Sequence, residues 1–276
     1  PLLPLAKLGV GGGHYNYLSY GALQKKPPQK EFLFPAGVIK NMNPANIIVE
    51  AFNADKITEA VNYAWYKKQK PLHPSEGETV YDLDKKKAYS FVKAPRYDNM
   101  PMEVGPLARQ LVAKNPDLLK LVGKGVKPGA VARHAARAIE TSLVVDACYK
   151  WCDQLLTEMT KPNFKIHDTD HWEPPETGTG AGFYEPPRGA LGHWLKIKDK
   201  KIEHYQCVVP STWNSSPRCN KKYRGQYEES LIGAPVPDPD NPINVVRIIR
   251  SFDPCLACAI HLIDPKSNEI KKFIVE

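Results

Sequence analysis

The chain has little cysteine and no long apolar run. Six cysteines among 276 residues are too few for the dense disulfide pairing of small secreted scaffolds, so free thiols are expected. No stretch of about 18 apolar residues occurs, so no segment is expected to span a bilayer. Internal repeats, low-complexity tracts and a signal-like start are also missing from this chain, which begins at Pro1. At 42% hydrophobic, residues 1–276 can bury a substantial core.

Charge of one sign is not gathered in any one region. The net charge is +8, and its short lysine runs lie far apart, at residues 67–68, 85–87 and 221–222. No predicted helix or strand brings these lysines onto one face, as a nucleic-acid-binding surface requires. A mildly basic, solvated surface and no nucleic-acid partner are therefore expected.

Hydrophobic spacing predicts more helix than strand. The longest predicted helix, residues 128–159, carries a broad apolar stripe, and its Cys148 and Cys152 are interpreted as core thiols. The fold class expected is mainly α, with long packed helices and small β excursions. Helical spacing occurs in residues 55–68, 105–114, 117–122, 128–159 and 243–251. Strands are expected within residues 31–50 and as a hairpin of residues 192–197 and 202–209.

Residues with metal chemistry cluster near the C-terminal end of the sequence. Cys255 and Cys258 have the C-x-x-C spacing that lets two sulfurs converge on one soft metal. Asp253 adds an acid before them, and His261 adds a further ligand after them. The spacing alone is ambiguous, because zinc sites, redox dithiols and cluster sites all use it. A zinc-stabilised binding module with these two thiols and the histidine is therefore one alternative.

Two earlier motifs narrow this choice. Residues 186–194 read Pro-Pro-Arg-Gly-Ala-Leu-Gly-His-Trp, and residues 206–214 read Gln-Cys-Val-Val-Pro-Ser-Thr-Trp-Asn. Together with residues 251–261, in this order and spacing, they resemble the C-terminal half of the large subunit of nickel–iron hydrogenases. Weaker similarity runs back to Leu18, so the resemblance covers essentially the whole chain, residues 1–276, as part of a single domain.

The resemblance implies a buried centre of nickel and of iron that carries carbon monoxide and cyanide. Cys255 would be a terminal nickel ligand and Cys258 a bridging one, since soft thiolates suit both metals. Arg188 would hold a permanent charge over the open metal position without ligating it, and Asp253 would orient that arginine. Arg188, Asp253 and Cys255 are thus the expected catalytic residues.

Further ligand contacts follow from the same resemblance. Pro187, Arg188, Pro210 and Ser211 are expected to line the pocket of the cyanide and carbonyl groups, where a buried anionic acceptor needs donors. The metal residues expected are Cys255, Cys258, Cys207 and His261. The last two, through the Cys207 carbonyl and the His261 ring, would hold a magnesium ion.

The resemblance also implies a function and partners. The expected reaction is the reversible oxidation of H2, with electrons passed to an iron–sulfur small subunit and, through it, to a membrane cytochrome on the periplasmic side. The family's other cysteine pair is absent, so a fragment or a split subunit is expected. Residues 262–276 resemble an extension that a maturation endopeptidase removes after His261. A non-catalytic structural relative is the other alternative, although such relatives generally lose the ligands.

Overall fold

The computed structural model describes residues 9–25, 31–167, 173–220, 222–255, 262–263 and 270–271. Cys258 and His261, and most of residues 262–276, lie outside the described residues. The helices are α2 Pro106–Val112, α3 Pro116–Gly123, α4 Ala130–Met159, α5 Pro210–Asn214, α6 Gln226–Ser230 and α7 Ile243–Ser251, with a 3-10 turn, η1, at Ala54–Lys56. The strands are β1 Tyr17–Gln24, β2 Phe32–Ile39, β3 Ile57–Ala60, β4 Ala94–Tyr97, β5 Thr177–Tyr184, β6 Leu191–Lys198, β7 Lys201–Val208, β8 Leu262–Ile263 and β9 Ile270–Lys271.

The antiparallel hairpin β1–β2 separates two hydrophobic cores. Because side chains alternate across a strand, Tyr17 and Ile39 face one core, whereas their neighbours Leu18 and Val38 face the other. All four are at most 1% exposed. This hairpin therefore has no solvated face over these positions, and it organises the rest of the chain on either side.

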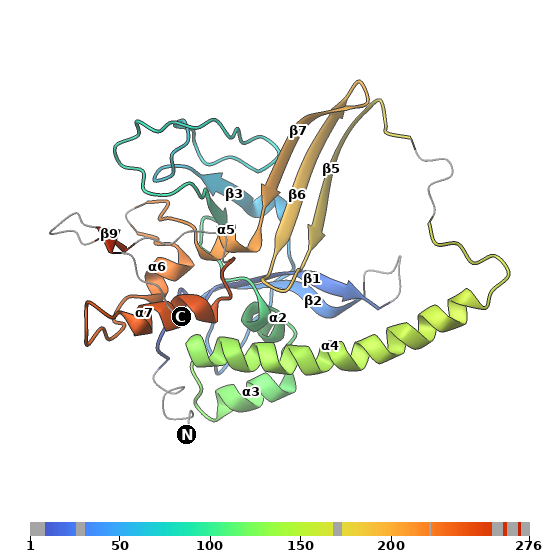
Figure 1. Ribbon diagram of the computed structural model, residues 1–276, viewed down its shortest axis with the longest axis horizontal. Coiled ribbons are helices and arrows are strands. Elements are labelled where there is room, and N and C mark those ends of the chain that lie inside the picture. Colours follow the sequence, from blue (N-terminus) through green and yellow to red (C-terminus); the bar gives the residue numbers. More distant parts are fainter. Residues whose placement is uncertain are drawn as a thin grey trace.

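The first core is covered by helices. Helix α2 packs on both strands of the hairpin and on α4, and in Figure 1 it lies between them. Leu111 and Leu118, both fully buried, come from α2 and α3, and Ala136 comes from α4. Helix α3 begins where the Asn115 side chain accepts hydrogen bonds from two backbone N–H groups of its first turn.

The second core lies under strands. The two-stranded sheet β3–β4 and the antiparallel sheet β5–β6–β7 contribute to it, and the latter rises on the side of β1–β2 opposite to α4 in Figure 1. Trp194 of β6, Val208 of β7 and Trp213 of α5 are at most 2% exposed there. This core holds the loops that carry the hydrogenase-like motifs.

The described residues form a mixed α/β arrangement of helices and small sheets, so the expected mainly α fold and helix bundle are not confirmed. The helices predicted at residues 105–114, 117–122, 128–159 and 243–251 are confirmed as α2, α3, α4 and α7. The predicted hairpin is confirmed as β6–β7. Gly-rich β5 was not expected, because its glycines carry no hydrophobic alternation.

The helix predicted over residues 55–68 is wrong. Its first part is the 3-10 turn η1 followed by β3, which pairs with β4. Beyond β3, the Lys85 ammonium donates to the carbonyl oxygens of Val61, Ala64 and Tyr66. Because a helix would bond its carbonyls internally, this lysine stabilises an irregular segment whose apolar residues only coincidentally have helical spacing.

The C-terminal half of α4 does not lie in a core. Tyr149 is 72% exposed and Leu156 is 62% exposed, and Figure 1 shows this end of the helix extending beyond the hairpin. Cys148 and Cys152 are also exposed, so their interpretation as core thiols is wrong. None of the helices formed by the described residues is both long and apolar enough to cross a membrane.

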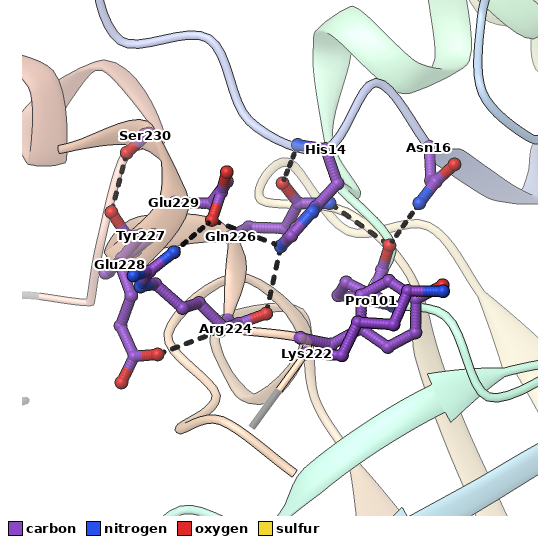
Figure 2. Close-up of polar contacts among 12 residues, drawn as sticks. His14, Asn16, Pro101, Lys222, Arg224, Gln226, Tyr227, Glu228, Glu229 and Ser230 are labelled. Atoms are coloured by element: carbon purple, nitrogen blue, oxygen red, sulfur yellow. Dashed lines mark hydrogen bonds and ion pairs between the residues drawn. The ribbon is translucent and has the colours of Figure 1, made fainter. Parts of the chain in front are cut away.

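A polar cluster ties the segment before β1 to the region around α6, as Figure 2 shows. Fully buried Gln226 accepts a hydrogen bond from the His14 backbone N–H at 3.1 Å and donates to the Pro101 carbonyl at 3.3 Å. The His14 ring nitrogen Nε2 lies 3.0 Å from the Arg224 carbonyl oxygen. Burial lowers the pKa of His14 below its usual value, against the opposing effect of Glu229.

This lowered pKa predicts a pH-dependent stability. The unfolded chain takes up a proton on His14 at a higher pH than the folded chain does. The contribution of neutral His14 to the free energy of unfolding is therefore complete above the unfolded pKa, about 6.5, and is lost as the pH falls. Between about pH 7 and pH 5, wild type should lose more stability than His14→Gln, which keeps an amide donor toward the Arg224 carbonyl. Urea unfolding at the two pH values measures the difference. Equal losses in the two proteins would contradict the assignment.

Candidate functional site

Two of the predicted site residues meet in the structure. The Nε of Arg188 donates to the Asp253 backbone carbonyl at 2.9 Å, and one terminal nitrogen lies 3.4 Å from the Asp253 carboxylate. Their side chains are 43% and 41% exposed. The pairing of this arginine with this acid is as the sequence predicted. The described residues alone, however, do not form the dry, deeply buried pocket that was expected around them.

The end of α7 directs the chain from Asp253 toward Cys255. Asp253 has a φ of +57°, in the left-handed region that aspartate tolerates better than most residues. Its backbone N–H donates to the Arg250 carbonyl at 2.9 Å, which closes the helix. The contacts from Arg188 then hold the turned residue from the other side.

Another arginine, which unlike Arg188 is buried, fixes the start of the same turn. Arg133 of α4 makes a two-pronged ion pair with Glu103, at 2.7 and 2.8 Å, and both side chains are 3% exposed. Its remaining nitrogen donates to the Ser251 hydroxyl at 3.1 Å, and its guanidinium lies 3.4 Å from the centre of the Phe252 ring. One turn later in α4, Arg137 donates to the Ser251 carbonyl at 3.1 Å.

A further buried arginine, Arg109, holds the loop that carries Arg188. Arg109 of α2 is 1% exposed, and it donates to the carbonyl oxygens of Pro186 and Pro187 at 3.1 and 2.9 Å. It also pairs with Glu185 at 2.8 Å and with both carboxylate oxygens of Glu140. Because its planar fork donates in fixed directions, this residue sets the path of the backbone immediately before Arg188.

Glu185 completes this arrangement from the loop side. It is fully buried, and it accepts a hydrogen bond from the Tyr20 backbone N–H at 2.7 Å as well as from Arg109. Burial raises the pKa of Glu185 to about 7, although Arg109 acts in the opposite direction. Two carboxylates, Glu185 and Glu140, share one guanidinium, which is a further reason for the raised value. Glu185 is thus a buried carboxyl that changes charge near neutral pH.

Two glycines allow the loop to pack closely. Gly189, at φ +129°, faces Gly105, at φ +119°, where α2 begins. A Cβ on Gly189 would lie 2.6 Å from the Gly105 backbone nitrogen. Only residues without a side chain fit this contact, which brings the arginine-bearing loop against the start of α2 and hence against Arg109.

The other predicted pocket residues come from neighbouring elements. Pro210, buried, and Ser211, half-buried, open α5 directly after β7. Pro187 is exposed, and Cys207 lies near the end of β7 with an exposed side chain. The α5 residue Trp213 shares the second core with Ala190 of the Arg188 loop. Within the described part of the chain, however, no hydrogen bond joins Ser211 to Arg188; it is the elements that carry them that pack together in this core.

Cys255 is half-buried and lies two residues after Asp253. The predicted ligands Cys258 and His261 lie outside the described residues. Across the described ranges, no group of three or more His, Cys, Asp and Glu side chains is placed to hold a metal. The donor chemistry near Cys255 nevertheless fits an anionic thiolate-bound centre, because the three arginines at residues 133, 137 and 188 all contact the segment 251–253 that leads to it.

The positioning residues were missed from the sequence. Arg109 lies in the predicted helix 105–114, two residues before Leu111, and Arg133 lies near the start of the predicted helix 128–159. A cation on the buried side of a helix needs a carboxylate partner, and this rule is the signal that could have found both. Which carboxylate pairs with each arginine depends on contacts that span 30 residues for Glu103 and Arg133 and 76 residues for Arg109 and Glu185.

Replacing Arg109 should destabilise the protein strongly. Arg109→Gln leaves the buried Glu185 and the half-buried Glu140 without their cation, and breaking a buried pair costs about 3–5 kcal/mol. The matched control is Arg224→Gln, whose ion pair with Glu229 is 40% and 29% exposed and should cost at most about 1 kcal/mol. Urea unfolding of the three proteins measures both changes. Similar losses in the two variants would mean that the Arg109 network contributes little.

Comparisons with known proteins agree with these motifs. The model of the nickel-dependent hydrogenase family matches residues 5–261. The chain is 36% identical to the hydrogenase-1 large chain of Citrobacter freundii, over 97% of this chain and 51% of that protein. It is 40% identical to the periplasmic [NiFeSe] hydrogenase large subunit of Desulfomicrobium baculatum, over 94% of this chain and 52% of that protein. The chain thus spans about half the length of these relatives.

Solved structures give the same result for the fold. The [NiFeSe] hydrogenase of Desulfomicrobium baculatum superposes with a TM-score of 0.77 at 40% identity, covering 94% of this chain and 56% of that one. A G491S variant of the [NiFeSe] hydrogenase of Desulfovibrio vulgaris Hildenborough gives 0.79 at 37% identity, covering 94% and 57%. The mixed α/β arrangement is therefore the arrangement of this part of those large subunits.

Proposed function

Because the chain belongs to the nickel-dependent hydrogenase family, we propose that it supplies half of a nickel–iron site that oxidises H2 reversibly to two protons and two electrons. The observation that carries the proposal is the contact of Arg188 with Asp253, two residues before Cys255. A guanidinium that is held by an acid two residues before a thiol supports the roles proposed for these three residues.

The nickel–iron centre, when bound, supplies the Lewis acid and the electron acceptor for heterolytic H2 cleavage. Cys255 and Cys258 would hold it through their sulfurs, and the Sγ of Cys255 is the base that receives a proton. Arg188 stays charged and does not ligate, so its guanidinium polarises a molecule at the site without blocking it. Asp253 fixes this guanidinium through its carbonyl and carboxylate oxygens.

The same proposal extends to neighbouring residues. Ser211 and Arg188 would donate hydrogen bonds to cyanide ligands on the iron, and Pro187 and Pro210, which lack N–H groups, would shape the pocket wall. The Cys207 carbonyl and the His261 ring would hold a magnesium ion. The hard carbonyl oxygen, together with waters, suits this ion.

The electrons must leave through another protein. The relatives are named as large subunits or large chains, and one of them, from Wolinella succinogenes, is named as quinone-reactive. We propose that this chain works in a heterodimer with an iron–sulfur small subunit that leads to a membrane cytochrome. The printed name of the Desulfomicrobium baculatum relative supports a periplasmic location. A maturation endopeptidase would act after His261.

Two other functions differ from this proposal in metal content. A non-catalytic structural relative would bind no metal, and a zinc-stabilised module would bind zinc through Cys255, Cys258 and His261. The chain is co-expressed with the segment that completes the large subunits of its relatives and with a small subunit, and the purified complex is analysed for metals. Nickel together with iron supports the proposal, whereas zinc alone or no metal would sink it.

The role of Arg188 predicts a large loss of activity in this complex. Arg188→Lys keeps the charge but loses the fixed fork toward Asp253, and removal of one such electrostatic contact costs about 10²- to 10³-fold in kcat. H2 oxidation by the metal-loaded complex, normalised to its nickel content, is the measurement.

A neighbouring exposed arginine provides the control. Arg250→Lys alters an exposed residue of α7, three positions before Asp253, and should retain nearly full activity. Asp253→Asn keeps the backbone carbonyl that accepts from Arg188 and tolerates the left-handed backbone, so it should lose less than Arg188→Lys. If Arg188→Lys oxidises H2 as fast as Arg250→Lys, the role given to the guanidinium is wrong.

A further inference from the structure

The sheet β5–β6–β7 has one face in the second core and one face that is open. Trp194 and Val208 lie on the buried face. Register places His193 directly opposite Cys207 on β7, with Tyr205 two residues before that cysteine. Because side chains alternate, these three lie together on the other face. Cys207 is exposed there, and Tyr205 is 48% exposed.

The side chains of Tyr205 and Cys207 both approach one ring nitrogen of His193. The Nδ1 of His193 lies 2.6 Å from the Tyr205 hydroxyl and 3.2 Å from the Cys207 sulfur. A neutral ring nitrogen accepts one hydrogen bond or donates one, so it cannot accept from the phenol and the thiol at the same time. The thiol is left with the Tyr205 oxygen as its hydrogen-bond partner. Sulfur, nitrogen and oxygen atoms that can each ligate a metal therefore lie within hydrogen-bond distance of one another.

We propose that Cys207, His193 and Tyr205 form a second metal site on the open face of this sheet, which binds a borderline divalent transition-metal ion such as Zn²⁺ or Co²⁺. Thiolate and imidazole are the ligands that such ions prefer in proteins. The site uses the Cys207 side chain and not its backbone carbonyl, so it is independent of the function proposed for Arg188 and Cys255.

The distances suit such an ion. Metal–sulfur and metal–nitrogen bonds are about 2.3 and about 2.0–2.1 Å long. If the sulfur–metal–nitrogen angle lies between a right angle and the tetrahedral angle, the two donor atoms are about 3.1–3.6 Å apart. The observed separation of sulfur and nitrogen is 3.2 Å, so both can bind one ion with little rearrangement. The Tyr205 oxygen adds a third donor at the same place.

Glycines leave room beside these donors. On β5, Gly182 pairs with His193 and Gly180 pairs with Leu195, which itself pairs with Tyr205. A Cβ on Gly182 or on Gly180 would meet no atom within 4 Å. The open face is therefore not covered by side chains of β5 beside His193, so water can reach this part of the sheet.

Cobalt binding tests the proposal at one fixed neutral pH under reducing conditions. The chain carries Cys255→Ser and Cys258→Ser, which remove the thiols of the proposed nickel–iron site, and Co²⁺ is titrated while the near-ultraviolet thiolate-to-cobalt absorption is recorded. One equivalent should bind with this absorption. Cys207→Ser should abolish the absorption, and His193→Gln and Tyr205→Phe should each weaken binding, the former at least about tenfold.

The matched control is Cys148→Ser, which removes another exposed thiol far along the chain, on α4, and should leave the titration unchanged. Circular dichroism verifies that each variant is folded. If the absorption survives Cys207→Ser, or if a folded chain with Cys207 intact gives none, the three side chains are a surface hydrogen-bonded cluster only and the metal site is refuted.

Discussion

The site depends above all on the buried guanidinium of Arg109. It binds the two carbonyl oxygens that immediately precede Arg188 and pairs with two carboxylates from distant parts of the chain. A buried cation without such partners would cost several kcal/mol, so the loop can take only the path that satisfies every donor. The loop is therefore positioned by α2, while the Arg188 guanidinium is held by Asp253 at the surface of the described chain.

A second set of arginine contacts holds the segment that leads to Cys255. Arg133 pairs with Glu103 and reaches the Ser251 hydroxyl, and Arg137 holds the carbonyl of the same serine. Loop and segment are thus fixed by arginines of different helices, and Arg188 joins them through its contacts with Asp253. Two of these three guanidinium groups are paired with carboxylates, so the arrangement fixes the path of the chain toward Cys255 rather than building a large net positive charge there.

The residues of the motifs were easier to predict from the sequence than the buried residues that position them. The pairing of Arg188 with Asp253 was implied by the resemblance to the hydrogenase family, and the long helix α4 followed from helical periodicity. The failures have tertiary causes: Lys85 stabilises an irregular segment where helical spacing suggested a helix, and the apolar residues of the second half of α4 remain exposed with Cys148 and Cys152. Periodicity describes which residues share a face, but it does not reveal what covers that face.

The most direct test of the account is a double-mutant cycle between Arg109 and Arg188, measured as H2 oxidation by the metal-loaded complex. Arg109→Lys keeps a buried charge but cannot bind both proline carbonyls and both carboxylates at once. If Arg109 acts by positioning Arg188, this change should slow the enzyme about tenfold or more and should have little further effect when Arg188→Ala is already present, a coupling of at least about 1 kcal/mol. An equal loss in both backgrounds would contradict the account.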